Sequence, residues 1–395
     1  MKKALLLKLF DAFTIQRWND KIRPFDLLEM DKNAHKMVIA YCLGRYEEDS
    51  GKEVNWNNII RGGIFELLRR VVLSDIKSPV YRRIKDKHSE VFGRLNEWVC
   101  MQLEPCIDSE EIKKELCEYL LDDSIIDQHS RDILSAAHIY ASYWEFLIIK
   151  HANPNGYQIN EIDRLIQNDL ERYLHLEGIK KIICKQPVSS FIDLVGQLRF
   201  QIRWSHAPRI PATSVLDHTL MVAIISYLLT RELGGCERRL RNNFFGGLFH
   251  DLPEAVTRDI ISPVKGAVED FPDVIGEIER EMVQKEVYPL VESHWIQELE
   301  YFTTDEFKSK ICVDGNVKNV TSEEITKEYN SDEFNPIDGE ITKVSDHLAA
   351  FIEAYKASES GFRAPQIDDG RHRLLNLYRG KTIGGVNVGS IYADF

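Results

Sequence analysis

A histidine and an aspartate stand side by side in the second half of this chain, directly after a strongly apolar run. The pair is His250-Asp251, and three further ionisable side chains follow it: Glu254, Asp259 and Lys265. Imidazole and carboxylate groups that lie close together can hold a divalent metal ion or move protons. Because so many ionisable groups are unusual in a buried helix, we expect the chemistry of the protein here.

Asp251 also has an interpretation that involves no chemistry. The segment Asp251-Leu252-Pro253-Glu254 has the pattern of a capping box, in which the aspartate caps a new helix and the glutamate reaches back. Pro253 would then end the helix that carries His250 and start another. The two interpretations are compatible, because a helix end allows both side chains of the His-Asp pair to turn into one cavity.

Two side chains outside this segment are further candidate ligands. His218 begins an apolar helix, where a histidine is more often a hydrogen-bonded core residue than a ligand. Asp346 lies opposite the apolar stripe of its helix, which usually means solvent, but small alanines on its side permit close packing. Two imidazoles and two carboxylates from separate helices would form the mixed nitrogen and oxygen set that suits a catalytic divalent ion.

A compact basic and aromatic group precedes His218 and consists of Arg203, Trp204, His206 and Arg209. An arginine can clamp a phosphate bidentately, and a tryptophan can face a sugar or a base. The alternative is an Arg-Trp pair that packs between helices. The pair Arg17-Trp18 in the first half of the chain gives that alternative real weight.

These residues need helices to position them, and the sequence is typical of an all-α protein. Glycine and proline are few, at 22 and 13 of 395 residues, and few hairpin signals interrupt the long patterned segments. In Lys343–Ser358 the apolar residues recur at the spacing of one helix face. Helices are also expected at Leu5–Phe13, Arg61–Leu73, Arg131–Ile149, Val215–Leu229 and Asn243–Asp251.

The composition limits the class of protein. A net charge of −13 argues against a nonspecific nucleic-acid binder, although a local basic pocket could still take a small anion. Seven cysteines without a C-x-x-C pair indicate neither a disulfide framework nor a zinc ribbon, which favours a reducing cytoplasm. Charged residues interrupt the N-terminal apolar run, and no stretch approaches the ~20 residues that span a bilayer. We therefore expect a soluble protein.

One pattern occurs twice in the chain. Gly62-Gly63-Ile64-Phe65, Asp75-Ile76 and Ser78-Pro79-Val80 match Gly246-Gly247-Leu248-Phe249, Asp259-Ile260 and Ser262-Pro263-Val264 at a constant offset of 184 positions (246 − 62). The pattern predicts a tandem duplication of two helical bundles, related by a possible pseudo-two-fold axis. We expect the copies at residues 1–182 and 187–395, with an insertion at about 309–341 in the second copy, as a loop or short hairpin.

Only the second copy carries the chemical residues. Where it has His250-Asp251, the first copy has Glu66-Leu67. Glu254 is replaced by Arg70, and Asp346 aligns with Ala137. Since the same scaffold is built without the His-Asp pair, the fold does not require that pair, and a chemical role explains it better.

The order His218, His250-Asp251, Asp346 resembles the signature of the HD-domain metal-dependent phosphohydrolases. The segment from His250 to Lys265, with Arg203-Trp204 fourteen residues before His218, is similar to the 5′-deoxynucleotidase branch of that family. The resemblance covers roughly 191–377. It implies an all-helical domain in which these two histidines and two aspartates hold one divalent metal ion, whose identity (Mn, Co, Fe, Ni, Zn or Mg) stays open.

The resemblance also implies roles for the neighbouring side chains. Glu254 would act on the attacking water, Asp259 would lie beside the substrate sugar, and Arg203 would contact the phosphate, with Lys265 as a further cation. Trp204 would favour deoxyribose over ribose.

The resemblance implies hydrolysis of a nucleotide phosphate ester, in particular of a (deoxy)nucleoside 5′-monophosphate to nucleoside and orthophosphate. Two alternatives stay open: a hydrolase of nucleoside triphosphates or other phosphoesters, and a nucleotide-sensing protein with a non-catalytic metal site. The expected partner is a small nucleotide, with no nucleic acid or membrane. The expected assembly is a monomer with an internal pseudo-dimer, or a homo-oligomer.

Overall fold

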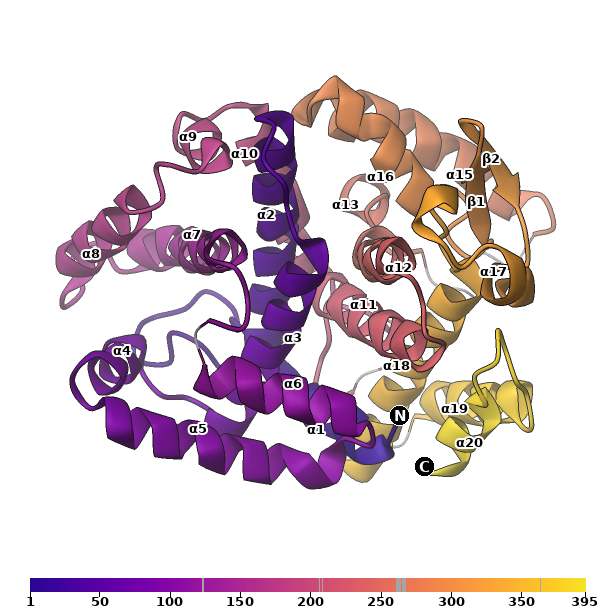
Figure 1. The fold of residues 1–395 in the computed structure, drawn as a ribbon, viewed down its shortest axis with the longest axis horizontal. Helices are drawn as coiled ribbons and strands as arrows, with labels where there is room; N and C mark the ends of the chain where they lie inside the picture. The colour runs from indigo at the N-terminus through magenta and orange to yellow at the C-terminus, as the bar shows by residue number, and fades with distance from the viewer. Residues whose placement is uncertain (123, 206, 208, 261–263, 265–267, 363) are drawn as a thin grey trace. The chain divides into compact units, whose positions relative to one another are not determined.

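The computed structural model describes residues 1–122, 124–205, 207, 209–260, 264, 268–362 and 364–395. It confirms the all-α fold, since helices dominate this part of the chain and the strands form one two-stranded sheet (Figure 1). Apart from the last two residues, the chain divides into two compact units, Met1–Lys180 and Lys181–Ala393. None of the helices in the described ranges has the length and hydropathy needed to cross a lipid bilayer.

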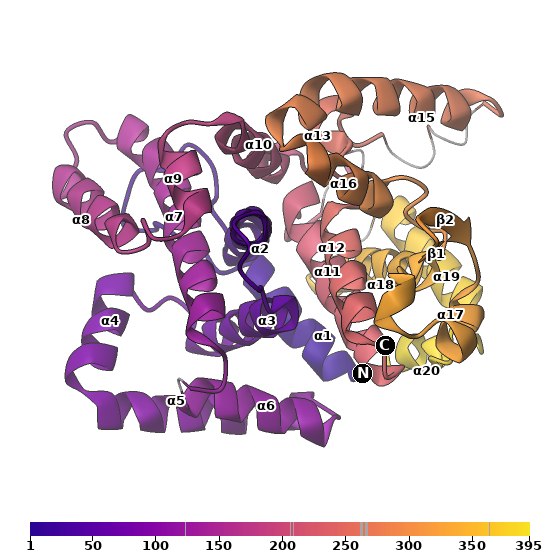
Figure 2. The same cartoon turned by 45° about the horizontal axis from the view of Figure 1, so that its top comes forward.

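The first unit is built around a long buried helix, α2, that contacts α3 and α7; Figure 2 looks along α2 and shows both neighbours beside it. The helices of the unit are α1 (Lys3–Phe10), α2 (Glu29–Asp49), α3 (Trp56–Leu73), α4 (Ser78–Lys87), α5 (Ser89–Leu103), α6 (Glu110–Leu121), α7 (Gln128–Ala152) and α8 (Ile159–Glu171), with short 3-10 turns at Asp11–Phe13 and Glu104–Cys106. Helix α9 (Glu177–Ile183) lies at the division between the units. The helix expected at the N-terminus is present, and α1 buries Leu5, Leu6, Leu9 and Phe10.

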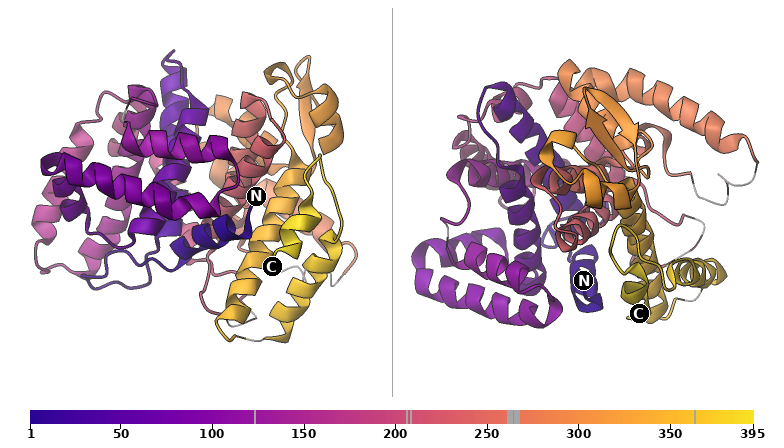
Figure 3. Two further views of the ribbon diagram at one scale, coloured as in Figure 1. Left: turned by 60° about the horizontal axis from the view of Figure 1, so that its bottom comes forward. Right: turned by 45° about the vertical axis from the view of Figure 1, so that its right-hand side comes forward.

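The second unit is centred on α11, which is buried on nearly all sides between α12 and α18. Its larger helices are α10 (Pro187–Gly196), α11 (Val215–Glu232), α12 (Glu237–Phe249), α15 (Phe271–Met282), α16 (Ile296–Thr303), α18 (Gly339–Glu359) and α19 (Pro365–Tyr378). Shorter helices are α13 (Glu254–Thr257), α17 (Ser322–Glu328) and α20 (Val388–Ala393). Helices α18 and α19 lie side by side (Figure 3).

Short 3-10 and π segments complete the second unit at Gln197–Phe200, Val283–Val287, Tyr288–Leu290, Ser293–Trp295 and Asp332–Phe334. The start of α11 is fixed by Ser214, whose hydroxyl accepts a hydrogen bond from the backbone N–H of Asp217 at 3.0 Å. Helices α11 and α12 approach closely because α12 carries Gly247 at their contact. A Cβ atom on Gly247 would lie 2.8 Å from the Cα of Ala223, so a glycine is needed there.

The segment at about 309–341 was expected to form a loop or a short hairpin, and it contains a short hairpin. Strands β1 (Lys310–Val313) and β2 (Asn316–Asn319) pair antiparallel, and the two residues that join them have φ of 49° and 77°, as a tight hairpin turn requires. The buried carboxylate of Asp338 holds this segment to the helices: Arg239 Nη2 donates to it at 2.6 Å, and the hydroxyls of Ser309 and Ser322 donate at 3.0 and 2.7 Å.

Helix ends near the His-Asp pair agree with one expectation and correct another. Helix α12 ends at Phe249 and α13 begins at Glu254, so the chain turns between them at Pro253, as expected. The capping-box interpretation of Asp251 is wrong. Helix α13 has Pro253 as its N-cap residue and no side-chain cap, because the carboxylate of Asp251 turns toward His250 instead.

A candidate metal centre between three helices

Three helices of the second unit bring two histidines and one aspartate together. His218 comes from the first turn of α11, His250 from the end of α12, and Asp346 from α18. Their potential ligand atoms all lie within 4.8 Å of one another, and within the described ranges no second group of three such side chains does so. The sequence placed these residues 32 and 96 positions apart (250 − 218, 346 − 250), and the packing of α11 against α12 and α18 closes both gaps.

Both histidines are held by their Nδ1 atoms. His218 Nδ1 lies 3.0 Å from Oε1 of Glu353, and His250 Nδ1 lies 2.8 Å from the carbonyl oxygen of Gly247. Since both partners are acceptors, each Nδ1 can donate its proton to its partner, and each Nε2 is thereby directed toward the centre. These Nε2 atoms point toward carboxylates, at 2.9 Å from Asp346 and 3.2 Å from Asp251.

The donor set fits a divalent cation. Neutral imidazole Nε2 atoms oriented through Nδ1, together with carboxylate oxygens, are the arrangement by which proteins hold such ions. The group with donors within 4.8 Å contains three of the four predicted ligands, His218, His250 and Asp346. The fourth, Asp251, lies beside His250, with its side chain 18% exposed, and is placed to act with them.

The charges at this centre favour bound cations at neutral pH. Burial alone would raise the pKa of Asp251, but the charge of His250 and its hydrogen bond lower that pKa to about 2. Burial would also raise the pKa of Asp346, but the hydrogen bond and charge of His218, with the charges of His250 and Arg203, together hold it far below its ordinary value. Burial would lower the pKa of His250, and the neighbouring Asp251 raises it to about 9. Both carboxylates are therefore ionised, and His250 is protonated at neutral pH in the metal-free protein, so that a bound metal ion would take the place of its Nε2 proton.

A buried carboxylate that the sequence analysis missed, that of Glu353, stands behind His218. It is only 1% exposed and also accepts a hydrogen bond from the indole N–H of Trp204 at 2.7 Å. The guanidinium groups of Arg209 and Arg203 lie 3.3 and 3.6 Å from it. A usable signal was its position seven residues after Asp346, which puts both side chains on one face of α18, two turns apart.

Arg203 lies next to the candidate ligand Asp251, and Trp204 is connected to the centre through Glu353. Arg203 Nη1 is 3.8 Å from Asp251 Oδ2, and its Nε makes no hydrogen bond to any residue that the structure describes. Trp204 has a positive φ of 58° and packs against a small cluster that includes Ala354 and Ile367. Its indole therefore has a packing role, whatever it does toward a substrate.

The remaining predicted site residues lie at the start of α13 and after it. Glu254 is buried, at 9% exposure. Burial would lower the pKa of Arg203, but the charges of four carboxylates raise it above its ordinary value, and Glu254 contributes less than Glu353, Asp251 and Asp346. Gln201 connects this turn by donating to the carbonyl of Glu254 at 2.9 Å and accepting from the backbone N–H of Asp259 at 3.3 Å. Lys265, His206, Ser262 and Pro263 lie outside the described residues.

Comparison with known proteins agrees with this centre. Residues 195–374 match the HD domain family, and this range includes His218, the His250-Asp251 pair and Asp346. The second unit is therefore similar to HD domains, a kind of domain that binds divalent metals. The chain is also similar to 4′-phosphooxetanocin A phosphatase of Priestia megaterium, with 33% identity over 81 residues. The match covers 20% of this chain and 42% of that relative, so it spans less than half of the relative's length.

Proposed function

We propose that the second unit is a metal-dependent phosphohydrolase that acts on a nucleotide, with a deoxynucleoside 5′-monophosphate as its substrate and a nucleoside and orthophosphate as products. The observation that carries this proposal is the group of His218, His250 and Asp346 with a partly buried arginine, Arg203, beside it. The match to the HD domain and the partial likeness to a phosphatase support the same class of reaction.

His218, His250, Asp251 and Asp346 would hold one divalent ion. When bound, such an ion supplies Lewis-acid activation of the phosphoryl group and of water. Glu353 orients His218 through Nδ1, and the carbonyl of Gly247 orients His250 in the same way, so that the two Nε2 atoms face the reaction centre.

Arg203 and Glu254 take the two remaining chemical roles in this proposal. The guanidinium of Arg203 would bind phosphate oxygens bidentately and stabilise the charge that develops on them. Glu254 would accept a proton from the attacking water as a general base. Asp259 and Trp204 would face the sugar, and Lys265 would add a positive charge at the phosphate.

The decisive test is release of orthophosphate from a panel of ribo- and deoxyribonucleotides by the purified full chain, with Mn, Co, Ni, Fe, Zn or Mg added. We expect turnover of deoxynucleoside monophosphates, and loss of at least a hundredfold in Asp251→Ala. Asp273→Ala on α15, an exposed position, is the matched control and should retain full activity. An inert wild type with every metal and nucleotide, or full activity in Asp251→Ala, refutes the proposal.

The same assay separates the two alternatives. Release of pyrophosphate or triphosphate would indicate a nucleoside triphosphate as substrate. Binding of nucleotides without turnover would indicate a sensing protein with a non-catalytic metal site. The first unit has Glu66-Leu67 where the second has the His250-Asp251 pair, and the loss of that pair favours such a binding role for the first unit.

We propose further that the two units arose by tandem duplication, and matching contacts support this. The isolated bridges Gln16–Leu28 and Ile202–Ser214 recur at an offset of 186 (202 − 16). The indole of Trp18 donates to Glu145 at 2.9 Å, as that of Trp204 donates to Glu353. If Glu145 corresponds to Glu353, the offset in this part of the chain is 208 (353 − 145). The same offset aligns Asp346 with His138, whereas the sequence comparison had aligned Asp346 with Ala137, one residue earlier.

A further inference from the structure

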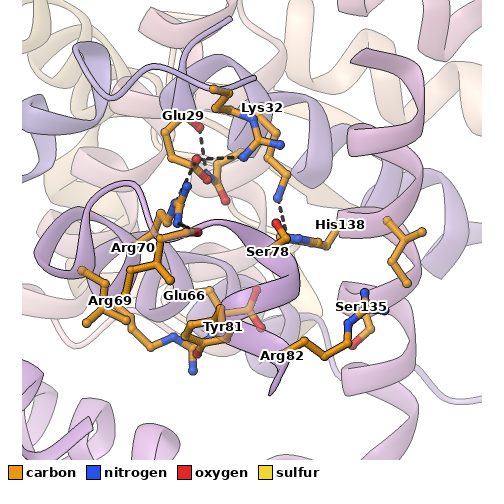
Figure 4. Close-up of a pocket in the computed structure, with 15 residues that line it drawn as sticks. Glu29, Lys32, Glu66, Arg69, Arg70, Ser78, Tyr81, Arg82, Ser135 and His138 are labelled. Carbon is orange, nitrogen blue, oxygen red and sulfur yellow. Dashed lines mark hydrogen bonds and ion pairs between the residues drawn. The ribbon is translucent and has the colours of Figure 1, made fainter. Parts of the chain in front are cut away.

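The first unit contains a pocket of about 290 Å³ whose lining is rich in cations. Figure 4 shows side chains of α2, α3, α4 and α7 around it. Five of the lining residues are basic: Arg17, Lys32, Arg69, Arg70 and Arg82. Only Glu29 and Glu66 among the lining residues are acidic. This pocket occupies the place in the first unit that corresponds to the candidate metal centre in the second.

A divalent metal ion is not the ligand that this pocket suits. Lys32 aligns with His218 at the offset of 186 (218 − 32), and its Nζ contacts Nδ1 of His138 (Figure 4), as His218 contacts Asp346. Lys32 offers an amine where the second unit has an imidazole, and an amine can bind a divalent ion only after it has lost its proton. The residue aligned with Asp251 is Leu67, which has no ligand atom and is 1% exposed.

The two carboxylates of the pocket are already paired. Arg17 Nη1 and Arg70 Nε lie 2.9 and 3.1 Å from Oε2 of Glu29. Glu66 pairs with Lys36 and accepts a hydrogen bond from the hydroxyl of Tyr119 at 3.0 Å. Each carboxylate is therefore already engaged by cations of the protein.

Lys32 and Arg69 complete the basic lining of the pocket. Burial, followed by the charge of Arg17, lowers the pKa of Lys32 well below its ordinary value. Burial would raise the pKa of Glu66, but the charge of Lys36 and then that of Arg69 lower it. The guanidinium of Arg69 lies 5.5 Å from the ring centroid of Tyr81. Arg82 is bound to Asp169 at 2.7 Å and is 53% exposed, at the outer side of the pocket.

We propose that this pocket binds a small phosphorylated molecule, such as a nucleoside monophosphate, without hydrolysing it. Arginine forks match the oxygens of a phosphate, and the bound negative charge would stabilise the protonated form of Lys32. The ring of Tyr81 offers an aromatic wall for a base, and the volume lies at the small end of ligand pockets, which measure roughly 300–1,000 Å³. This binding site goes beyond the proposed phosphohydrolase activity, since it does not depend on the second unit being catalytic.

The test is isothermal titration calorimetry on the full chain, treated with a chelator, with inorganic phosphate and with deoxyadenosine monophosphate as probes. The wild type should bind at least one probe at a site that Arg69→Gln weakens at least tenfold. Arg94→Gln, an exposed arginine of α5 outside the pocket, is the matched control and should bind as the wild type does. Circular dichroism shows whether each variant is folded.

Arg82→Gln is the second variant, because a half-exposed side chain can be replaced without disturbing the core of the unit. This variant should weaken binding of the probe at the same site at least threefold. Equal binding of both probes supports recognition of the phosphate alone, and tighter binding of the nucleotide supports recognition of the base as well. Binding that neither variant changes, or no binding of either probe, overturns the proposal. Phosphate release by Asp346→Asn that is lost in the double variant Asp346→Asn/Lys32→Met would overturn the non-hydrolytic part.

Discussion

Oε1 of Glu353 lies 3.0 Å from Nδ1 of His218, and both side chains are buried. The two residues are 135 positions apart in the chain, on α18 and α11. Because an ionised carboxylate can only accept at this contact, it fixes the proton of His218 on Nδ1 and leaves Nε2 free for a metal ion. Glu353 therefore determines how His218 can be used, although it does not face the centre itself.

Replacing Glu353 by glutamine should weaken metal binding. The amide keeps the size of the side chain but loses the charge that orients His218, and loss of such an outer partner typically costs about 10–100-fold in metal affinity. The measurement is titration of the metal-free protein with Mn²⁺ or Co²⁺. Glu359→Gln, exposed near the end of the same helix, should leave the affinity unchanged. An unaltered affinity in Glu353→Gln would contradict this role.

Adding a methyl group at Gly247 should disturb the contact between α11 and α12. The new Cβ would lie 2.8 and 3.0 Å from backbone atoms of Ala223, which cannot move aside as a side-chain end can. We expect Gly247→Ala to lower the free energy of unfolding by about 1–3 kcal/mol and to weaken metal binding, because the carbonyl of Gly247 holds His250.

The control for this change is Gly276→Ala in α15, where a Cβ would meet only the end of Arg280 at 3.6 Å. Alanine is the better helix former by roughly 0.5–1 kcal/mol, so this variant should be slightly more stable than the wild type in chemical denaturation. Equal stability of the two alanine variants would show that the approach of α12 to α11 is not as tight as the contact distances indicate.

Trp204→Phe separates a packing role of the indole from a substrate role. Phenylalanine retains an aromatic ring in the cluster with Ala354 but loses the N–H that donates to Glu353. If the proposed sugar selection is right, the ratio of kcat/KM for deoxyribo- over ribonucleotides should fall at least fivefold. A lowered melting temperature with an unchanged ratio would assign Trp204 to structure alone.

Stability in acid should depend on Glu29. Burial alone would raise the pKa of Glu29, but Arg17 and then Arg70 lower it far below the unfolded value of about 4.3. A carboxylate with a depressed folded pKa stabilises the protein above its unfolded pKa, and this contribution is lost as the pH falls toward the folded pKa. The free energy of unfolding of the wild type should therefore exceed that of Glu29→Gln by about 3 kcal/mol near neutral pH, and this difference should shrink below about pH 5.

Urea unfolding at several pH values, followed by circular dichroism, measures this difference. Glu90→Gln, at an exposed position of α5, is the control and should follow the wild type at every pH. A difference between wild type and Glu29→Gln that stays constant from pH 7 to pH 3 would show that the ion pairs with Arg17 and Arg70 do not stabilise the unit through charge.

Local sequence patterns were sufficient for several of the helices and for naming the candidate metal ligands. The apolar periodicity of α18 and the position of Pro253 predicted where helices run and where the chain turns, because both effects act over a few residues. A chemical role could be inferred for the His250-Asp251 pair because the matching pattern in the first half of the chain lacks it. Residue type alone predicted the mixed nitrogen and oxygen donor set.

Only the tertiary structure decided which distant side chains meet. The sequence favoured neither side for Asp346, since a position opposite an apolar stripe faces solvent unless another helix covers it, and here α11 covers it. Glu353 and the cationic pocket of the first unit had no local signal beyond spacing, because each depends on contacts between residues more than one hundred positions apart. Hydrogen bonds and ion pairs form over a few ångströms in space, and helix packing sets those distances.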